Sequence, residues 1–391
     1  MLQIKEEDSN RNAIVVVGYN RIKSITRLLN SLLSAEYSEE VPLVISIDCS
    51  GDTEVYQKAI DFEWPFGNKY VNIQTERLGL KNHIYFCGGL SEFFKSVTIL
   101  EDDLYVSKCF YKYVSNAVEE YGQDGNIAGI SLYKNEHNGF NSLPMTFLKD
   151  GADVFAYQST GTWGETFTWQ MWQNFTLWLS SWDEDFSKVD MYQEIKRWKK
   201  AWSKYYEAYI ILNNKYFIYP FLSVCTNFSD AGTHVSNDIV SNAYQVELLF
   251  KSIDYRMPAF ENLLKYDTYA QFIGIDKYIG GKVIMDLYGN RENIIYKDNY
   301  VLSVNVLPYK IIKSFGIRLR PIELNVIYGI EGEGIYLYDT SQYGSNRDLP
   351  NPSLVQADYY LRSFDFRKLS RYCKSYIVHK IYGKIKKIFK A

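Results

Sequence analysis

The stretch Val97-Thr98-Ile99-Leu100-Glu101-Asp102-Asp103 passes from a short β-branched and apolar run directly into three carboxylates. Adjacent carboxylates repel one another and lose hydration when buried, so a folded protein tolerates them best beside a cation, a hydroxyl-rich ligand or water. Hard oxygen ligands favour Mg²⁺ or Mn²⁺, often held by one or two carboxylates together with phosphates. The alternative is an acidic turn that favours the start of the following helix. The stretch therefore predicts a buried strand ending at a cation site or an acidic turn.

Strand-like and helix-like patterns alternate in the residues before this acidic triplet. A continuous apolar run at 13–17 and mainly apolar segments at 43–47, 70–73 and 97–100 predict buried strands. The stretches whose apolar residues recur at helical spacing lie at 25–33 and 84–94. This alternation predicts the α/β class, with a mostly parallel sheet flanked by helices. In such folds, ligands bind outside the carboxyl ends of the strands.

Polar residues follow three of the predicted strands. Arg21 comes after the first strand, Asp48 after the second, and residues 101–103 end the fourth. Because the carboxyl ends of parallel strands meet at one edge of a sheet, a shared ligand explains these groups better than three unrelated loops. The loop after the first strand carries neither a G-x-G-x-x-G nor a P-loop motif, which argues against a dinucleotide or ATP site.

The order of these motifs resembles the nucleotide-sugar domain of glycosyltransferase family 13, the N-acetylglucosaminyltransferase I-like enzymes. The matching residues are 16–21 (Val-Val-Gly-Tyr-Asn-Arg), 46–49 (Ser-Ile-Asp-Cys), His83 with Gly89, 101–104 (Glu-Asp-Asp-Leu), 110–113 and 130–131. The resemblance covers about residues 12–236, and similar domains occur in bacterial enzymes that build surface polysaccharides. It implies a GT-A-type fold and a nucleotide-sugar donor.

The resemblance also implies roles for individual residues at the strand ends. Arg21, Asp48 and His83 would contact the nucleotide of a UDP-sugar, with Asp48 close to the uracil. Glu101 would also belong to the nucleotide site, and Asp102 would face the ribose. Read without the resemblance, Arg21 could form a surface ion pair, and His83 could be a helix-start residue hydrogen-bonded to backbone.

Two residues are the expected metal ligands. By the resemblance, Asp103 binds Mn²⁺ (or Mg²⁺), which bridges the diphosphate and stabilises the charge that develops as the nucleotide leaves. His234 follows a predicted strand at 223–228, in a segment that often closes the donor site in glycosyltransferases of this fold. A neutral imidazole suits Mn²⁺. The alternative for His234 is a loop histidine without a ligand.

The stretch Gly161-Thr162-Trp163-Gly164-Glu165-Thr166-Phe167 resembles the family's loop that shapes the pocket for donor sugar and acceptor. Small residues let the backbone approach a sugar closely, and an aromatic ring offers a stacking face. Four tryptophans follow at spacings that place several indoles along one broad helical face, which predicts mainly core positions. They are Trp169, Trp172, Trp178 and Trp182.

The family's Trp-Asp-Asp-Trp motif, whose second aspartate is the general base, falls on Trp202-Ser203-Lys204-Tyr205, so both acids are missing. Lys204 is protonated at neutral pH and cannot simply replace a carboxylate. An inverting transfer needs a carboxylate within hydrogen-bond reach of the attacking hydroxyl. Glu165, in the pocket loop, and Glu207, one helical turn beyond the expected place, are the two candidates. The acidic stretch 182–185 comes too early and predicts a solvated turn.

The chain of 391 residues is long enough for one large domain with appended regions. We expect a nucleotide-sugar domain over 1–238, an accessory or acceptor region over 239–362 and a basic amphipathic tail over 363–391. Within the accessory region, 300–307 and 324–336 have strand-like patterns.

Composition favours a cytoplasmic protein. The five cysteines show no C-x-x-C spacing and are odd in number, which favours reduced thiols over a disulfide framework. The first residues are charged and contain no apolar segment of the secretory type, so we expect no signal peptide.

The end of the chain is strongly basic. Residues 367–391 contain nine Lys or Arg residues and no Asp or Glu. Apolar residues recur at helical spacing among these cations, at Ile377, Ile381, Ile385, Ile388 and Phe389. This pattern predicts an amphipathic helix on an anionic membrane surface. The alternatives are docking on the acidic remainder of the protein, or a nucleic-acid arm. No nucleic-acid partner is expected, because an acidic body repels a phosphate backbone.

These observations predict a metal-dependent inverting glycosyltransferase of surface polysaccharide synthesis, peripheral on the inner face of a bacterial plasma membrane. It would move a sugar, N-acetylhexosamine by preference, from a UDP-sugar to a hydroxyl of a glycan or lipid-linked glycan. One alternative is the same fold with another donor, such as UDP-galactose. A second is a catalytically inactive nucleotide- or glycan-binding relative, which the missing acid pair makes a serious possibility. A third is a peripheral membrane scaffold whose tail is the functional part.

Overall fold

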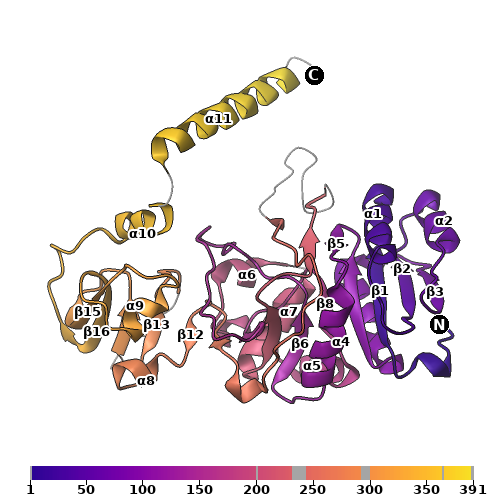
Figure 1. Cartoon of the computed structure of the whole chain (residues 1–391), viewed down its shortest axis with the longest axis horizontal. Coiled ribbons are helices and arrows are strands. Elements are labelled where there is room, and N and C mark those ends of the chain that lie inside the picture. The colour runs from indigo at the N-terminus through magenta and orange to yellow at the C-terminus, as the bar shows by residue number, and fades with distance from the viewer. Residues whose placement is uncertain (1, 200, 231–243, 292–299, 363–364, 389–391) are drawn as a thin grey trace. The chain divides into compact units, whose positions relative to one another are not determined.

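The computed structural model describes residues 2–199, 201–230, 244–291, 300–362 and 365–388 (Figure 1). The chain divides into two units, Met1–Lys277 with Asn290–Ile294, and Tyr278–Gly289 with Ile295–Ala391. The domain boundary expected after residue 238 lies outside the described residues.

A large β-sheet forms the centre of the first unit. In the described part of the chain it has ten strands, in the order β12-β11-β7-β9-β6-β8-β4-β1-β2-β3. The strand bounds are β1 (Asn12–Gly18), β2 (Leu43–Ile47), β3 (Lys69–Ile73), β4 (Ser96–Glu101), β6 (Ile127–Ser131), β7 (Val154–Tyr157), β8 (Glu165–Phe167), β9 (Tyr216–Pro220), β11 (Lys265–Tyr266) and β12 (Phe272–Ile273). The strands β4, β1, β2 and β3 are all parallel, whereas β8 is antiparallel to both of its neighbours. The predicted class, a mostly parallel sheet flanked by helices, is confirmed.

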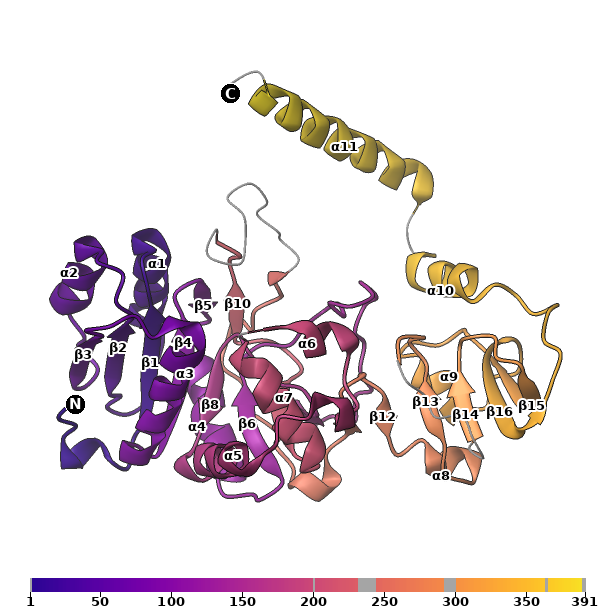
Figure 2. The same ribbon diagram turned by 180° about the vertical axis from the view of Figure 1, so that it is seen from behind.

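The helices of this unit connect and cover these strands. They are α1 (Ile22–Leu33), α2 (Thr53–Asp61), α3 (Gly79–Gly89), α4 (Phe110–Tyr121), α5 (Trp169–Ser181), α6 (Gln193–Arg197) and α7 (Trp202–Leu212). Short 3₁₀ turns lie at Glu6–Asp8, Leu90–Phe93, Phe186–Lys188 and Phe260–Asn262. The helix α1 buries Ile25, Leu28, Leu29 and Leu32, the stripe that its sequence predicts. Helices α3, α5 and α7 pack against one another (Figure 2).

The four predicted core tryptophans of residues 169–182 are core only in part, because Trp169, Trp178 and Trp182 are half-buried. Trp172 is fully buried, and Trp178 and Trp182 stack on each other with ring centroids 4.6 Å apart beside an apolar cluster. The acidic turn at 182–185 is mainly exposed, and its Asp183 forms an ion pair with Lys188. That turn is therefore a solvated structure, as expected.

A second, two-stranded ladder continues from the acidic triplet. The strand β5 (Leu104–Val106) follows Asp103 directly and pairs antiparallel with β10 (Cys225–Asn227). This pairing brings residues 227–230 next to residues 102–103, although they are far apart in the sequence.

The second unit contains a four-stranded sheet in the order β13-β14-β16-β15 among its described residues. Its elements are α8 (Asp276–Ile279, across the division), β13 (Ile284–Asp286), β14 (Tyr300–Ser303), β15 (Tyr309–Gly316), α9 (Glu323–Ile327), β16 (Gly334–Tyr343) and α10 (Pro352–Leu361). The strand predicted at 324–336 is wrong over most of its length: its first residues form α9, a turn follows, and only 334–336 belong to β16. The buried Asn325 side chain accepts hydrogen bonds from the backbone N–H groups of Arg318 and Leu319, which closes a turn that a strand could not make.

The predicted tail helix is present as α11 (Phe366–Ile388). Among its described side chains, the apolar and aromatic groups other than the half-buried Leu369 are exposed, with Tyr372 at 71%, Val378 at 65% and Ile377 at 55%. No helix in the described part of the chain combines the length and apolar character needed to cross a bilayer.

Candidate active site

The carboxyl ends of β1, β2 and β4 meet at one edge of the sheet. Val17 is in register with Glu101, and Gly18 is in register with Ile47. The residues that immediately follow these strands therefore lie along one edge, as the sequence predicts for a shared site.

Arg21 joins two acids of the triplet. It is the N-cap residue of α1, and its Nη2 forms an ion pair with Asp102 Oδ1, while its Nε donates to Asp102 Oδ2 at 3.3 Å. The same Nη2 lies 3.2 Å from Asp103 Oδ2. The side chain of Arg21 is 22% exposed, that of Asp102 5% and that of Asp103 17%. Arg21 therefore forms an ion pair, but not on the open surface. It lies at the edge of the sheet that carries Glu101, Asp102 and Asp103, called the acidic edge below, which is largely enclosed.

The carboxylates of Asp102 and Asp103 share the one guanidinium of Arg21. Burial raises the pKa of Glu101 to about 8, and the charges of Asp103 and Asp102 add to that shift. Burial likewise raises the pKa of Asp102 to about 6 and raises the pKa of Asp103, although Arg21 opposes both shifts. At neutral pH Glu101 is therefore mostly protonated, and the charge of Asp102 and Asp103 exceeds the single positive charge of Arg21, which favours the binding of a further cation.

Asp103 could supply one protein ligand to a divalent metal. Its carboxylate offers hard oxygen atoms, of which Oδ1 accepts a hydrogen bond from Asn227 Nδ2 at 3.3 Å and Oδ2 faces Arg21. No group of three or more His, Cys, Asp or Glu side chains is arranged as a metal site in the described ranges. A metal here would therefore depend on phosphate oxygens of a ligand for most of its coordination. His234, the second expected ligand, lies outside the described residues.

Asp48 and His83 are buried beside β2. The carboxylate of Asp48 accepts hydrogen bonds from the backbone N–H groups of Cys49, Leu78 and Gly79 at 2.8–2.9 Å, and so holds the start of α3. His83 lies within α3, and its Nε2 is hydrogen-bonded to Ser46 Oγ at 2.8 Å. Burial lowers the pKa of His83 to about 4, against the opposing charge of Asp48. His83 is therefore neutral at physiological pH.

Glu207 anchors the glycine-containing loop. Its Oε2 accepts hydrogen bonds from the backbone N–H and the hydroxyl of Thr160, at 2.6 and 2.9 Å. Its Oε1 accepts from the hydroxyl of Thr268 at 2.9 Å. Thr160 immediately precedes the loop 161–164, so this carboxylate fixes the point at which the loop begins.

Glu165 is the more enclosed of the two candidate bases. It lies on β8 in register with Ile99 and Ser131, and it is 1% exposed. Neither of its carboxyl oxygens has a well-formed hydrogen bond among the described residues. Burial raises its pKa well above the usual range, and the charge of Glu101 adds to the shift, with only a small opposing effect from the Gly164 amide. Glu165 is therefore a neutral acid close to the acidic edge.

The other aromatic and basic residues of this region have structural contacts. Trp163 packs between Tyr133 and Tyr244, with ring centroids 4.8 and 4.7 Å apart. The Lys204 Nζ donates to the carbonyls of Lys196 and Trp198 at 2.6 and 3.1 Å. Lys204 thus secures local backbone, in keeping with the expectation that it does not replace the missing acid.

Sequence reasoning missed Asn227 and Asp230. The carbonyl of Asp230 accepts a hydrogen bond from Arg21 Nη1 at 3.3 Å, and its carboxylate accepts from Ser24 Oγ at 2.7 Å and pairs with Arg27. The signal that could have found them is that Asn227, Ser229 and Asp230 lie at or just after the end of the strand predicted at 223–228, much as the acidic triplet ends its own strand.

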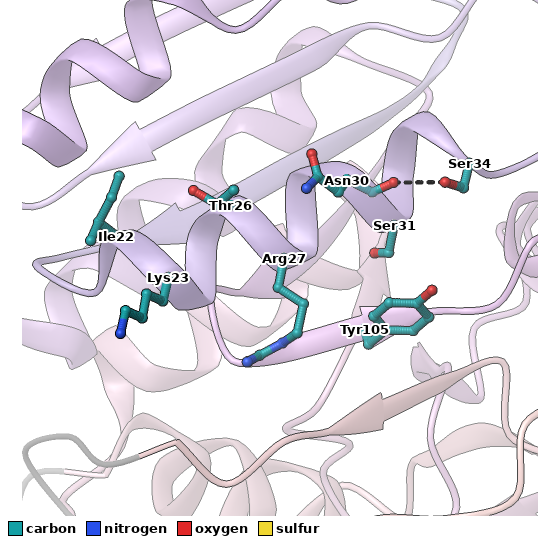
Figure 3. Close-up of a pocket in the computed structure, with 8 residues that line it drawn as sticks. All are labelled: Ile22, Lys23, Thr26, Arg27, Asn30, Ser31, Ser34 and Tyr105. Atoms are coloured by element: carbon teal, nitrogen blue, oxygen red, sulfur yellow. Dashed lines mark hydrogen bonds between the residues drawn. The ribbon is translucent and has the colours of Figure 1, made fainter.

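An open groove of about 460 Å³, whose exposed lining surface is mainly apolar, lies between α1 and β5 (Figure 3). Its lining residues are Ile22, Lys23, Thr26, Arg27, Asn30, Ser31, Ser34 and Tyr105. Arg27 also pairs with Asp230, whereas the acids of the triplet do not line the groove. The groove therefore lies beside the acidic edge and is not the proposed ligand site at Asp102 and Asp103.

Comparisons with known proteins gave structural similarity alone. No protein-family model and no curated protein matches the chain. Among solved structures, S. aureus TarS 1-349 in complex with UDP-GlcNAc is 18% identical, with a TM-score of 0.38, and the match covers 59% of this chain and 62% of that one. The mannosyltransferase PcManGT from Pyrobaculum calidifontis, in complex with GDP-Man and Mn²⁺, is 16% identical, with a TM-score of 0.38 and coverages of 59% and 60%. The chain thus spans about three fifths of these proteins, and membership of glycosyltransferase family 13 stays a prediction.

Proposed function

We propose that the first unit binds a nucleotide-sugar with a divalent metal at the edge formed by β1, β2 and β4, and transfers the sugar to an acceptor hydroxyl. The observation that carries this proposal is the meeting of Arg21, Asp102 and Asp103 at the carboxyl ends of parallel strands. The surplus of enclosed carboxylate favours a ligand that brings a cation, as a metal-bound diphosphate does.

The chain's own residues would divide the work as follows. Asp103 would hold Mn²⁺ or Mg²⁺, which when bound stabilises the charge that develops on the departing diphosphate. Arg21 would donate to phosphate oxygens, and Asp102 would accept from the ribose hydroxyls. Asp48 and the neutral His83 would shape the base pocket, and Glu101 would also belong to the nucleotide site. His234 stays a proposed second metal ligand.

The general base is proposed from Glu165 and Glu207. A base needs an oxygen that is free to accept the proton of the acceptor hydroxyl. Each oxygen of Glu207 already accepts from Thr160 or Thr268, whereas those of Glu165 have no such partner in the described chain. This difference favours Glu165, provided that ligand binding gives the acceptor access to it and lowers its pKa.

The donor we propose is a UDP-N-acetylhexosamine, and the acceptor is a glycan or lipid-linked glycan. The runner-up is another nucleotide sugar such as UDP-galactose, and the remaining alternative is an inactive nucleotide- or glycan-binding relative. The test is a panel of UDP- and GDP-sugars incubated with the full chain and Mn²⁺. An active enzyme releases the nucleoside diphosphate from one donor and stops when the metal is chelated. Tight UDP binding with no turnover of any donor would favour the binding protein.

We also propose that α11 rests on an anionic membrane surface. Its described apolar and aromatic groups other than Leu369 are exposed, and residues 367–391 carry nine cations and no acid. Exposed aromatic and aliphatic side chains together with cations suit the lipid headgroup region. This contact would keep the first unit on the inner face of the plasma membrane, near a lipid-linked acceptor.

A further inference from the structure

The cation that now faces the proposed metal ligand belongs to the protein itself. Within the described residues, Arg21 forms ion pairs with both Asp102 and Asp103. Its guanidinium engages both oxygens of Asp102 and one oxygen of Asp103, and its Nη1 donates to the carbonyl of Asp230. The guanidinium is thus held by Asp102 and Asp103 after β4 and by the backbone of Asp230.

This arrangement conflicts with metal binding at Asp103. A divalent cation on Asp103 Oδ2 and a guanidinium nitrogen 3.2 Å from that atom would be like charges a few ångströms apart. The conflict is strong because the site is largely enclosed and weakly screened. Arg21 must therefore leave Asp103 before a metal can settle there.

A diphosphate offers Arg21 a better alternative partner. A planar guanidinium donates two parallel hydrogen bonds to phosphate oxygens, which gives a strong and directional contact. Arg21 sits at the junction of β1 and α1, and its long side chain can turn from the acids to a ligand above them without movement of the strand.

We propose that Arg21 is a positioning residue that serves as a stand-in cation: it holds Asp102 and Asp103 together before the ligand arrives and excludes free metal from Asp103. The inference rests on the proposed function and deepens it. The metal is admitted together with the diphosphate, because the diphosphate draws Arg21 away and supplies the remaining metal ligands. Metal and nucleotide then bind in a strongly coupled way, each much more tightly in the presence of the other.

The test measures Mn²⁺ binding to the full chain by the electron paramagnetic resonance signal of free Mn²⁺, with and without UDP. In the wild type, Mn²⁺ alone binds weakly and UDP strengthens its binding. Arg21→Met removes the stand-in cation, so Mn²⁺ alone should bind more tightly by on the order of tenfold, the effect of one nearby charge in a poorly screened site. The same variant should bind UDP with Mn²⁺ less tightly, by on the order of tenfold, because the phosphate loses its Arg partner.

Two further variants control this experiment. Arg21→Lys keeps the charge and should keep the weak binding of Mn²⁺ alone. Arg27→Met removes a cation from the same helix that pairs with Asp230 and not with the triplet, so it should leave Mn²⁺ binding unchanged. Thermal unfolding of each variant checks that the first unit is folded.

Each outcome decides a separate question. Equal binding of Mn²⁺ alone by Arg21→Met and by the wild type would overturn the stand-in role. Weaker binding of both Mn²⁺ and UDP in a folded Arg21→Met protein would also overturn it, because Arg21 would then only maintain the site. Absence of Mn²⁺ binding in the wild type even with UDP would instead contradict the proposed function.

Discussion

The carboxylate of Glu207 accepts hydrogen bonds from both the backbone N–H and the hydroxyl of Thr160. This pair ties the middle of α7 to the residue just before the loop 161–164, and the Thr268 hydroxyl donates to the other carboxyl oxygen of Glu207. A buried carboxylate that already accepts three hydrogen bonds holds its neighbours in place. It has no oxygen free to take a proton from an acceptor hydroxyl, as a general base must.

Glu207→Gln should therefore retain most of the activity. The amide oxygen can still accept from Thr160, and the amide nitrogen can donate to the Thr268 hydroxyl, so turnover should fall by less than about tenfold. Loss of a general base costs about 10²–10⁴ in rate. Single-turnover assays with the best donor of the panel measure this difference. A loss of that larger size in Glu207→Gln, with UDP affinity retained, would make Glu207 the base.

Glu165→Gln is the matched test of the other candidate. If Glu165 takes the proton, turnover should fall by about 10²–10⁴ while UDP affinity is unchanged. The substitution is nearly isosteric and replaces an acid that is already neutral in the unliganded protein, so thermal stability should not drop. Full activity of Glu165→Gln would remove Glu165 from the reaction.

His83 should make the first unit sensitive to acid. Its pKa is about 4 in the folded protein and 6.5 in a model peptide, so the unfolded chain binds the proton first as the pH falls. The free energy of unfolding should therefore decline between about pH 6.5 and pH 4, by about 3 kcal/mol in total from this residue. His83→Gln should lack that decline in urea unfolding of the first unit, whereas substitution of the exposed His137 should preserve it. Identical pH profiles for His83→Gln and the wild type would contradict a neutral, buried His83.

The tail should bind anionic vesicles and not neutral ones. Each cation near an anionic surface contributes about 1 kcal/mol, so the combined variant Lys368→Glu, Arg371→Glu and Lys374→Glu should reduce vesicle partitioning by at least about a hundredfold. These residues are exposed on α11, so the folded units should be unaffected. Co-sedimentation with vesicles measures the partitioning, and deletion of 367–391 gives the baseline. Unchanged sedimentation of the deletion variant would remove the membrane proposal.

Much of the fold could be predicted because its signals are local. The strands β1, β2 and β4 are almost entirely buried and mainly apolar, and α1 has a clear apolar stripe. In these elements the apolar pattern of the sequence matches the residues that the fold buries. The helix α9 escaped prediction because the Asn325 side chain, and not the apolar pattern, decides the backbone there.

The sequence allowed the position of the site at the strand ends to be predicted, but not the hydrogen-bond and ion-pair partners of its side chains. Parallel pairing brings residues 21, 48 and 101–103 to one edge whatever their side chains do. By contrast, the anchoring of Glu207 depends on Thr160 and Thr268, which are 47 and 61 residues away in the sequence. The contact of Arg21 with Asp230 likewise joins residues that are 209 positions apart. Such pairings arise from tertiary structure, which local patterns do not encode.

The most direct test of the proposed site is calorimetric titration of UDP into the full chain with Mn²⁺ and with a chelator, for the wild type and Asp103→Asn. Asp183→Asn, at an exposed acid outside the site, is the control. The wild type and Asp183→Asn should bind UDP at least about tenfold more tightly with Mn²⁺, and Asp103→Asn should lose this dependence because the metal loses its protein carboxylate. Two results would contradict a metal-dependent nucleotide-sugar site at Asp103. One is a wild-type affinity for UDP that does not change with Mn²⁺, and the other is an equal effect of Mn²⁺ in Asp103→Asn and the wild type.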